Sequence, residues 1–184
     1  MQELLFALWF FLPAGIANGA PVIANKIPIL NKLTTPMDFG KHYKDRRIFG
    51  DNKTWRGLLF GIFSAVFIVM LQRFAYQNWG WAQEISQGIN YGAGNIWLLG
   101  MLLGLGALLG DAVESFIKRQ MHIPSGESWF PLDQFDYVIG GLLASAFFVV
   151  LSLEQYVVIF ILWFSMHIFW AYFFYLIGFK DKPI

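Results

Sequence analysis

Long apolar stretches alternate with shorter polar ones along the chain. A helix rises about 1.5 Å per residue and the hydrocarbon core of a bilayer is about 30 Å thick, so roughly 17–25 apolar residues suffice to cross it. Five stretches qualify, at about 4–24, 57–72, 95–119, 133–153 and 156–178, of which the second and fourth are the shortest. The pattern predicts an all-α membrane protein, a bundle of five transmembrane helices forming a single transmembrane domain over residues 1–184.

The distribution of positive charge gives this bundle an orientation. Of the 13 Lys and Arg residues, all but Arg73 fall in one set of loops or at the C-terminus. These are Lys26, Lys32, Lys41, Lys44, Arg46, Arg47, Lys53, Arg56, Lys118, Arg119, Lys180 and Lys182. Because cytoplasmic loops are enriched in Lys and Arg, we expect cytoplasmic loops at about 25–56 and 120–132, an N-terminus outside and a C-terminus in the cytoplasm.

Composition narrows the chemistry. The chain is 57% hydrophobic and 14% charged, which is more apolar than the roughly 45–50% typical of soluble domains. It contains no cysteine, which excludes disulfides, thiolate zinc sites, iron–sulfur clusters and a cysteine nucleophile. The remaining chemistry must use oxygen and nitrogen groups.

Small residues and prolines predict how two helices pack. Gly100, Gly104, Gly106 and Gly110 form small-xxx-small pairs in the third helix, which favour close helix packing. Room for a lipid chain is the alternative explanation of these glycines. Pro13 and Pro21 should distort the first helix, because proline removes a hydrogen bond within a helix.

Carboxylates gather at the predicted cytoplasmic boundary. An aspartate at the centre of a membrane helix costs about 2.5–3.5 kcal/mol, so it needs a partner. Asp111 lies near the cytoplasmic end of the third helix, with Ser115 and Lys118 on the same face. Asp133 and Asp136 open the fourth helix one turn apart. A helix-terminal charge cluster, or an N-cap role for Asp133, is the alternative. Three carboxylates without cysteine suit a hard divalent ion such as Mg²⁺, held with help from substrate phosphates.

The first cytoplasmic loop has features of a phosphate site. Gly50, Asp51 and Asn52 favour a turn, which leaves Lys53, Thr54 and Arg56 where the second helix begins and its amides point outward. Topology alone also enriches such a loop in Lys and Arg. The loop lacks the spacing of a Walker A motif.

Two motifs resemble a known family. Nine residues resemble the signature of integral-membrane, CTP-dependent phosphatidate cytidylyltransferases: Gly110, Asp111, Ser115, Phe116, Lys118, Arg119, Asp133, Gln134 and Asp136. The segment Gly50–Gly57 resembles the corresponding part of the CDP-archaeol synthase family, which are small five-helix enzymes, and the resemblance covers essentially the whole chain.

This resemblance implies an activity. Such enzymes transfer CMP from CTP to a lipid phosphate with Mg²⁺, releasing diphosphate and leaving a CDP-activated lipid. The expected partners are therefore CTP, a lipid phosphate of the archaetidic ether type or phosphatidic acid, and the bilayer, with no nucleic acid. The expected location is a multi-pass cell-membrane protein whose active site faces the cytoplasm, and the oligomeric state is left open.

The resemblance also implies roles for particular residues. It makes Asp111, Asp133 and Asp136 metal ligands and, with Lys118, catalytic residues. The substrate-binding candidates are Lys53, Thr54, Arg56, Ser115, Arg119, Asp51, Arg46 and Arg47. For Asp51, Arg46 and Arg47, topology or ion pairing explains the residues equally well. His167 is interpreted as an interhelical hydrogen-bonding residue and receives no role.

Two other classes compete with this interpretation. The CDP-alcohol phosphotransferases also place aspartates on membrane helices, but their Asp-x-x-Asp-Gly signature does not continue after Asp133 and Asp136. A small membrane transporter or ion-binding protein with a cytoplasmic carboxylate site is the second alternative. Such a protein typically carries charge near the membrane midplane or internal repeats, and neither is found in the sequence.

Overall fold

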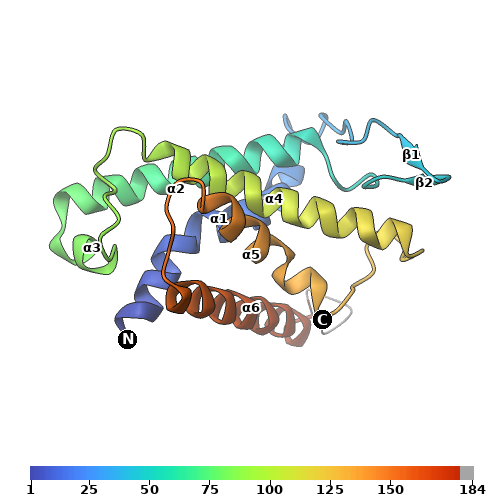
Figure 1. The fold of residues 1–184 in the computed structure, drawn as a ribbon. Helices are drawn as coiled ribbons and strands as arrows, with labels where there is room; N and C mark the ends of the chain where they lie inside the picture. The colour runs from blue at the N-terminus through green and yellow to red at the C-terminus, as the bar shows by residue number, and fades with distance from the viewer. Residues whose placement is uncertain (179–184) are drawn as a thin grey trace.

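The computed structural model describes residues 1–178, which form a mostly helical bundle (Figure 1). Its elements in chain order are α1 (Gln2–Lys26), β1 (His42–Tyr43), β2 (Arg46–Arg47), α2 (Trp55–Asn78), α3 (Gly80–Ile85), α4 (Trp97–Gln120), α5 (Leu132–Ser145) and α6 (Leu153–Leu176). The predicted C-terminal segment with Lys180 and Lys182 lies outside the described residues.

Four helices are long and apolar enough to cross a membrane: α1, α2, α4 and, within α6, Leu153–Phe173. The fourth predicted stretch, 133–153, is not one helix. It ends as α5 after 14 residues, and a turn and extended backbone follow before Ser152 starts α6 with a capping box. At about 1.5 Å per residue α5 is about 21 Å long, so five crossings stay a prediction.

The long helices surround a shared apolar core. In Figure 1, α2 and α4 run alongside each other, α6 lies on the far side of the bundle, and α3 and the β1–β2 hairpin occupy opposite ends. Phe6, Phe10 and Phe11 of α1 are fully buried at the centre, where they pack with Leu103 of α4 and Ile159 of α6. Large apolar side chains such as Phe63 and Phe67 point outward, as expected of a surface that faces lipid.

Pro13 lies inside α1, and its effect is compensated by a neighbouring helix. Without an amide hydrogen at Pro13, the carbonyl of Trp9 has no partner one turn further along α1. The buried side chain of Gln72 in α2 donates its amide hydrogen to this carbonyl at 2.5 Å. The proline thereby becomes a point of attachment between α1 and α2.

The glycines of α4 mediate close packing on two sides, which confirms the packing prediction. A side-chain carbon at Gly100 or Gly104 would meet the backbone of α2 at 2.8 Å and 3.2 Å, from Val66 and Ile62. One at Gly106 would lie 2.4 Å from the carbonyl oxygen of Gly140 in α5. The α4 and α5 backbones therefore touch directly, which brings Asp111 and Asp136 close.

The loop between α1 and α2, residues 27–54, is folded around Asp38. Its buried carboxylate accepts hydrogen bonds from the backbone amides of Gly40, Phe49 and Gly50 and from the Arg47 guanidinium at 2.8 Å. Burial would raise the pKa of this carboxyl, but these bonds outweigh it and hold the pKa well below its usual range.

A hairpin projects from the same loop. Lys44 and Asp45 both have positive φ angles, 48° and 62°, which is the geometry of a tight two-residue turn between β1 and β2. Arg46 bonds the backbone oxygen of Gln120 and lies against His122. The hairpin is thus attached to the end of α4, beside the predicted site.

Candidate active site

A polar cavity of about 510 Å³ opens at the hairpin end of the bundle. It lies where the ends of α4 and α5 meet the two loops expected in the cytoplasm. Residues of both helices and both loops line it, among them Lys53, Asp111, Glu114, Lys118, Asp133 and Asp136. The two motifs that carry the family resemblance therefore face the same space.

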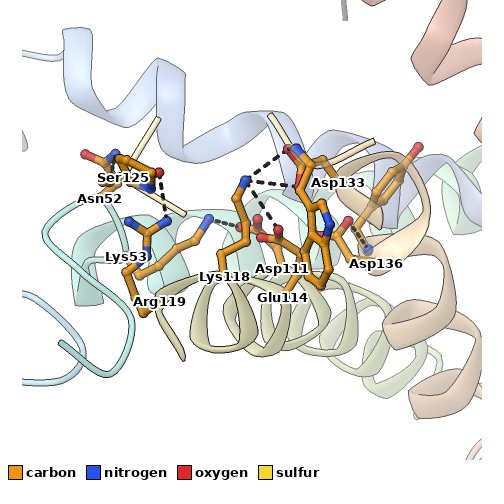
Figure 2. A network of polar contacts seen from close by, with 12 residues as sticks. Asn52, Lys53, Asp111, Glu114, Lys118, Arg119, Ser125, Asp133 and Asp136 are labelled. Carbon is orange, nitrogen blue, oxygen red and sulfur yellow. Dashed lines mark hydrogen bonds and ion pairs between the residues drawn. The ribbon is translucent and has the colours of Figure 1, made fainter. Parts of the chain in front are cut away.

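Three carboxylates converge on one wall of this polar cavity (Figure 2). Asp111 and Glu114 come from α4 and Asp136 from α5, and one oxygen of each lies within 4.8 Å of the others. Two of the three predicted metal ligands are thus together, joined by Glu114. Because Asp111 and Glu114 are three residues apart on a helix, that spacing was the signal that could have identified Glu114.

Asp133, the third predicted metal ligand, lies next to this group and is paired with Lys118. The Lys118 ammonium lies 3.0 Å from Asp133 and 3.3 Å from Glu114, as Figure 2 shows. Asp133 also accepts the backbone amide of Trp129 at 2.9 Å, so it fixes the start of α5 against α4. Lys118 is buried and offsets the charge of two carboxylates.

Lys53 reaches the same cluster from the loop between α1 and α2. Its ammonium lies 2.6 Å from a carboxylate oxygen of Asp111. The neighbouring Asn52 donates to Ser125 in the second loop at 3.0 Å, so the two loops meet over the polar cavity. Ser115 and Arg119 also line the cavity, and Arg119 donates to the backbone oxygen of Pro124.

Other predicted substrate-binding residues lie further away. Asp51, Thr54 and Arg56 line a separate cavity of about 550 Å³ between α1 and α2, called here the α1–α2 cavity. Lys53 and Asp111 line both cavities and so join them. Thr54 caps α2 by accepting the Gly57 amide, and Arg56 donates to Asn25 and to the Leu30 backbone.

Arg46 and Arg47 line neither of these two cavities. Arg46 bonds the end of α4, and Arg47 is paired with Asp38 and with Asp51 at 2.6 Å. These contacts favour the ion-pairing explanation of both arginines, and a substrate role for them stays a prediction.

The arrangement suits a divalent cation bound by oxygen. Three carboxylates this close together repel one another unless a cation lies between them. Lys53 and Lys118 neutralise only part of their negative charge. Hard cations such as Mg²⁺ take carboxylate oxygens and keep positions for phosphate oxygens, for which the polar cavity has room. Asp111, Glu114 and Asp136 are the residues that fit such an ion.

Comparison with a solved structure defines the class of the protein. The chain matches a structure described as "Structural insight into an intramembrane enzyme for archaeal membrane lipids biosynthesis" with a TM-score of 0.68 and 30% identity, over 88% of this chain and 89% of the other. Together with the four apolar helices, this likeness defines an integral membrane protein with the fold of a lipid-biosynthesis enzyme.

Sequence comparison then gives the family. A CDP-archaeol synthase of Thermococcus onnurineus is 36% identical over 187 residues, covering 100% of this chain and 98% of the relative. One from Pyrococcus furiosus is 39% identical over 143 residues, covering 77% and 75%. The family model described as "CarS-like: CDP-archaeol synthase" matches residues 1–184, and the chain belongs to this family.

Proposed function

We propose that this protein is a CTP-dependent cytidylyltransferase that converts a lipid phosphate into a CDP-activated lipid and diphosphate. The observation that carries the proposal is the carboxylate cluster of Asp111, Glu114 and Asp136, which lies beside Lys53 and Lys118 in a cavity at the end of a membrane bundle. Membership in a family named for CDP-archaeol synthase supports an ether-linked, archaetidic-type lipid phosphate as the acceptor.

The reaction needs no protein nucleophile. An oxygen of the lipid phosphate attacks the α-phosphorus of CTP, a new P–O bond forms, and the bond to the β-phosphate breaks as diphosphate leaves. Catalysis of this kind depends on positioning and on offsetting negative charge. Lys118 and Arg119 line the polar cavity and would hold the CTP phosphates, while Lys53 would hold a phosphate next to Asp111.

The acidic residues supply the remaining part of the site. Mg²⁺ held by Asp111, Glu114 and Asp136 would act as a Lewis acid on the phosphate oxygens. Asp133 holds Lys118 in place through its ion pair, and the same aspartate fixes the Trp129 backbone. Removal of the Asp111 carboxylate should therefore abolish turnover while the apolar bundle stays folded.

The site would open to the cytoplasm, where CTP is found. In the predicted five-helix topology, twelve of the 13 Lys and Arg residues fall on the cytoplasmic side, together with the site. This asymmetry supports five crossings with the N-terminus outside, with α5 and the segment 146–152 together making the fourth crossing.

The test is CTP-dependent diphosphate release by purified protein in lipid micelles. Archaetidic-type ether phosphate and phosphatidic acid are offered separately, with Mg²⁺ present or chelated. We expect Mg²⁺-dependent release with the ether phosphate, its loss in Asp111→Asn, and in Glu114→Gln an increase of at least about tenfold in the Mg²⁺ concentration for half-maximal rate.

Glu127→Gln is the matched control, because Glu127 lines the same polar cavity outside the carboxylate cluster. It should leave the Mg²⁺ requirement unchanged. Folded protein that releases no diphosphate with either lipid would overturn the proposal and favour an ion-binding or transport role.

A further inference from the structure

An apolar groove lies between α1 and α6, next to the candidate active site. This α1–α6 groove has a volume of about 440 Å³, and its walls include Asn18, Gly19, Trp163, Met166, His167 and Trp170. Both helices that form it are long and apolar enough to cross a membrane. The groove therefore lies at the depth of the lipid chains.

The α1–α6 groove joins the candidate active site at two points. His167 lines both the groove and the polar cavity, and its ring lies 5.7 Å from that of Tyr137. Asn18 lines both the groove and the α1–α2 cavity, which contains Lys53 and Arg56. An extended molecule in the groove would thus end beside the cationic groups of the site.

We propose that the α1–α6 groove binds one hydrocarbon chain of the lipid phosphate and directs its phosphate toward Lys53. This inference rests on the proposed function, and it specifies where the lipid substrate lies. The occupant is amphipathic because the walls of the groove are mostly apolar, while Asn18 and His167 lie where the groove meets the two cavities of the site. A volume of about 440 Å³ lies within the range of roughly 300–1,000 Å³ that is usual for small-molecule sites.

The charged residues near its end distinguish the α1–α6 groove from a second apolar groove that is another possible site for the lipid chain. A second apolar groove of about 480 Å³, the α4–α5 groove, also reaches the carboxylate cluster. The charged residues that line it are the two carboxylates Glu114 and Asp136, and no Lys or Arg of the described residues lines it to pair with a phosphate. The α1–α6 groove instead leads to Lys53 and Arg56, so its polar end complements an anionic head group.

One wall of the α1–α6 groove offers a clean experimental position. A side-chain carbon at Gly19 would meet no atom within 4 Å, so a larger residue there can extend into the groove. Gly15, one turn earlier, is unsuitable because such a carbon would lie 2.2 Å from the Trp163 ring. Gly80 in α3 has equally free space and is not among the residues that line the groove, which makes it the matched control.

The experiment compares Gly19→Leu with Gly80→Leu on lipid phosphates with long and with short chains. We expect Gly19→Leu to raise the KM for the long-chain substrate about tenfold, the effect of losing burial of about two methylene groups. The KM for CTP and the KM for a short-chain substrate that does not fill the groove should be unchanged. Gly80→Leu should behave as the unsubstituted protein.

A binding readout separates this inference from the proposed function. Trp163 and Trp170 line the groove, so a lipid phosphate with bromine in its chain should quench tryptophan fluorescence, and Gly19→Leu should reduce that quenching. If no diphosphate is released but this difference in quenching persists, the proposed function fails and the groove assignment stands.

Three results would overturn the groove assignment. The first is an unchanged long-chain KM and unchanged quenching in Gly19→Leu. The second is an equal loss of activity for long and short chains with weakened CTP binding, which indicates a structural effect. The third is a raised long-chain KM in Leu143→Trp alone, since Leu143 lines the α4–α5 groove.

Discussion

Asp38 holds the loop between α1 and α2 together. Its side chain has no solvent exposure and accepts bonds from three backbone amides and from Arg47. These bonds hold the loop in the shape that places Lys53 next to Asp111. A residue without a catalytic assignment thereby determines the geometry of the site.

Asp38 should make the stability of the protein depend on pH. Because its pKa is lowered in the folded state, its stabilising contribution is complete above the unfolded pKa of about 3.9 and is lost as pH falls below that value. We expect Asp38→Asn to lower stability at neutral pH by about 1–3 kcal/mol and to remove this acid-dependent loss. Thermal unfolding in detergent between pH 7 and pH 3 measures both.

Asp45→Asn is the control for this measurement. Asp45 is exposed in the hairpin turn with a φ of 62°, a conformation that asparagine also tolerates. It should leave the pH dependence of the unfolding temperature as it is. Equal pH profiles for Asp38→Asn and the unsubstituted protein would contradict the assignment.

At this scale the sequence predicted most of the acidic site. Asp111 and Asp136 were recognised because a membrane protein places carboxylates near lipid only with partners, and both lie in the cluster. Glu114 and the pairing of Asp133 with Lys118 were missed, because they depend on how α5 packs against α4. The fold of the loop around Asp38 also depends on contacts that no local pattern encodes.

A hydrogen bond between α1 and α2 compensates for the proline inside α1. Pro13 leaves the Trp9 carbonyl unpaired within α1, and Gln72 supplies the missing donor. Replacement of Pro13 by alanine restores an amide hydrogen at that position. The Trp9 carbonyl then has a partner within α1 and no longer depends on the hydrogen bond from Gln72.

A double-mutant cycle tests this coupling. We expect Gln72→Leu to destabilise the protein by about 0.6–1.7 kcal/mol, the range measured for hydrogen bonds between membrane helices, and to have little effect in a Pro13→Ala background. Unfolding in mixed micelles gives the four free energies. Additive effects of the two substitutions would show that the Trp9 carbonyl does not couple them.

The sequence predicted which segments are helical better than it predicted where the helices begin and end. The apolar runs of α1, α2, α4 and α6 identify those elements, because length and hydropathy alone decide them. The run at 133–153 is also apolar, but its helix ends at Ser145, and a new helix begins after the capping box of Ser152 and Gln155. The hairpin and α3 are too short to leave a periodic pattern, so sequence reasoning placed both within loops.

The whole molecule is polar at one end and apolar along most of its length. If the hairpin end faces the cytoplasm, Lys41 and Gly94, which are exposed in opposite loops, lie on different sides of the membrane. The absence of cysteine makes this directly testable. Lys41→Cys and Gly94→Cys each introduce a single thiol.

An impermeant maleimide should label Gly94→Cys in right-side-out vesicles and Lys41→Cys only in inverted vesicles. Labelling of both from the same side would contradict an odd number of crossings between these loops and would remove the cytoplasmic orientation of the site. Detergent-solubilised samples, in which both thiols should react, provide the control for accessibility.

The direct contact between the α4 and α5 backbones has a consequence for ion size. No side chain separates Gly106 and Gly110 from Gly140, so the two helices cannot move apart or together by changing a rotamer. Asp111 and Asp136 are short side chains on this fixed frame. Mg²⁺ binds oxygen at about 2.0–2.1 Å and Ca²⁺ at about 2.3–2.6 Å. We therefore expect the glycines behind the carboxylates to make the site favour the smaller ion, Mg²⁺, over Ca²⁺.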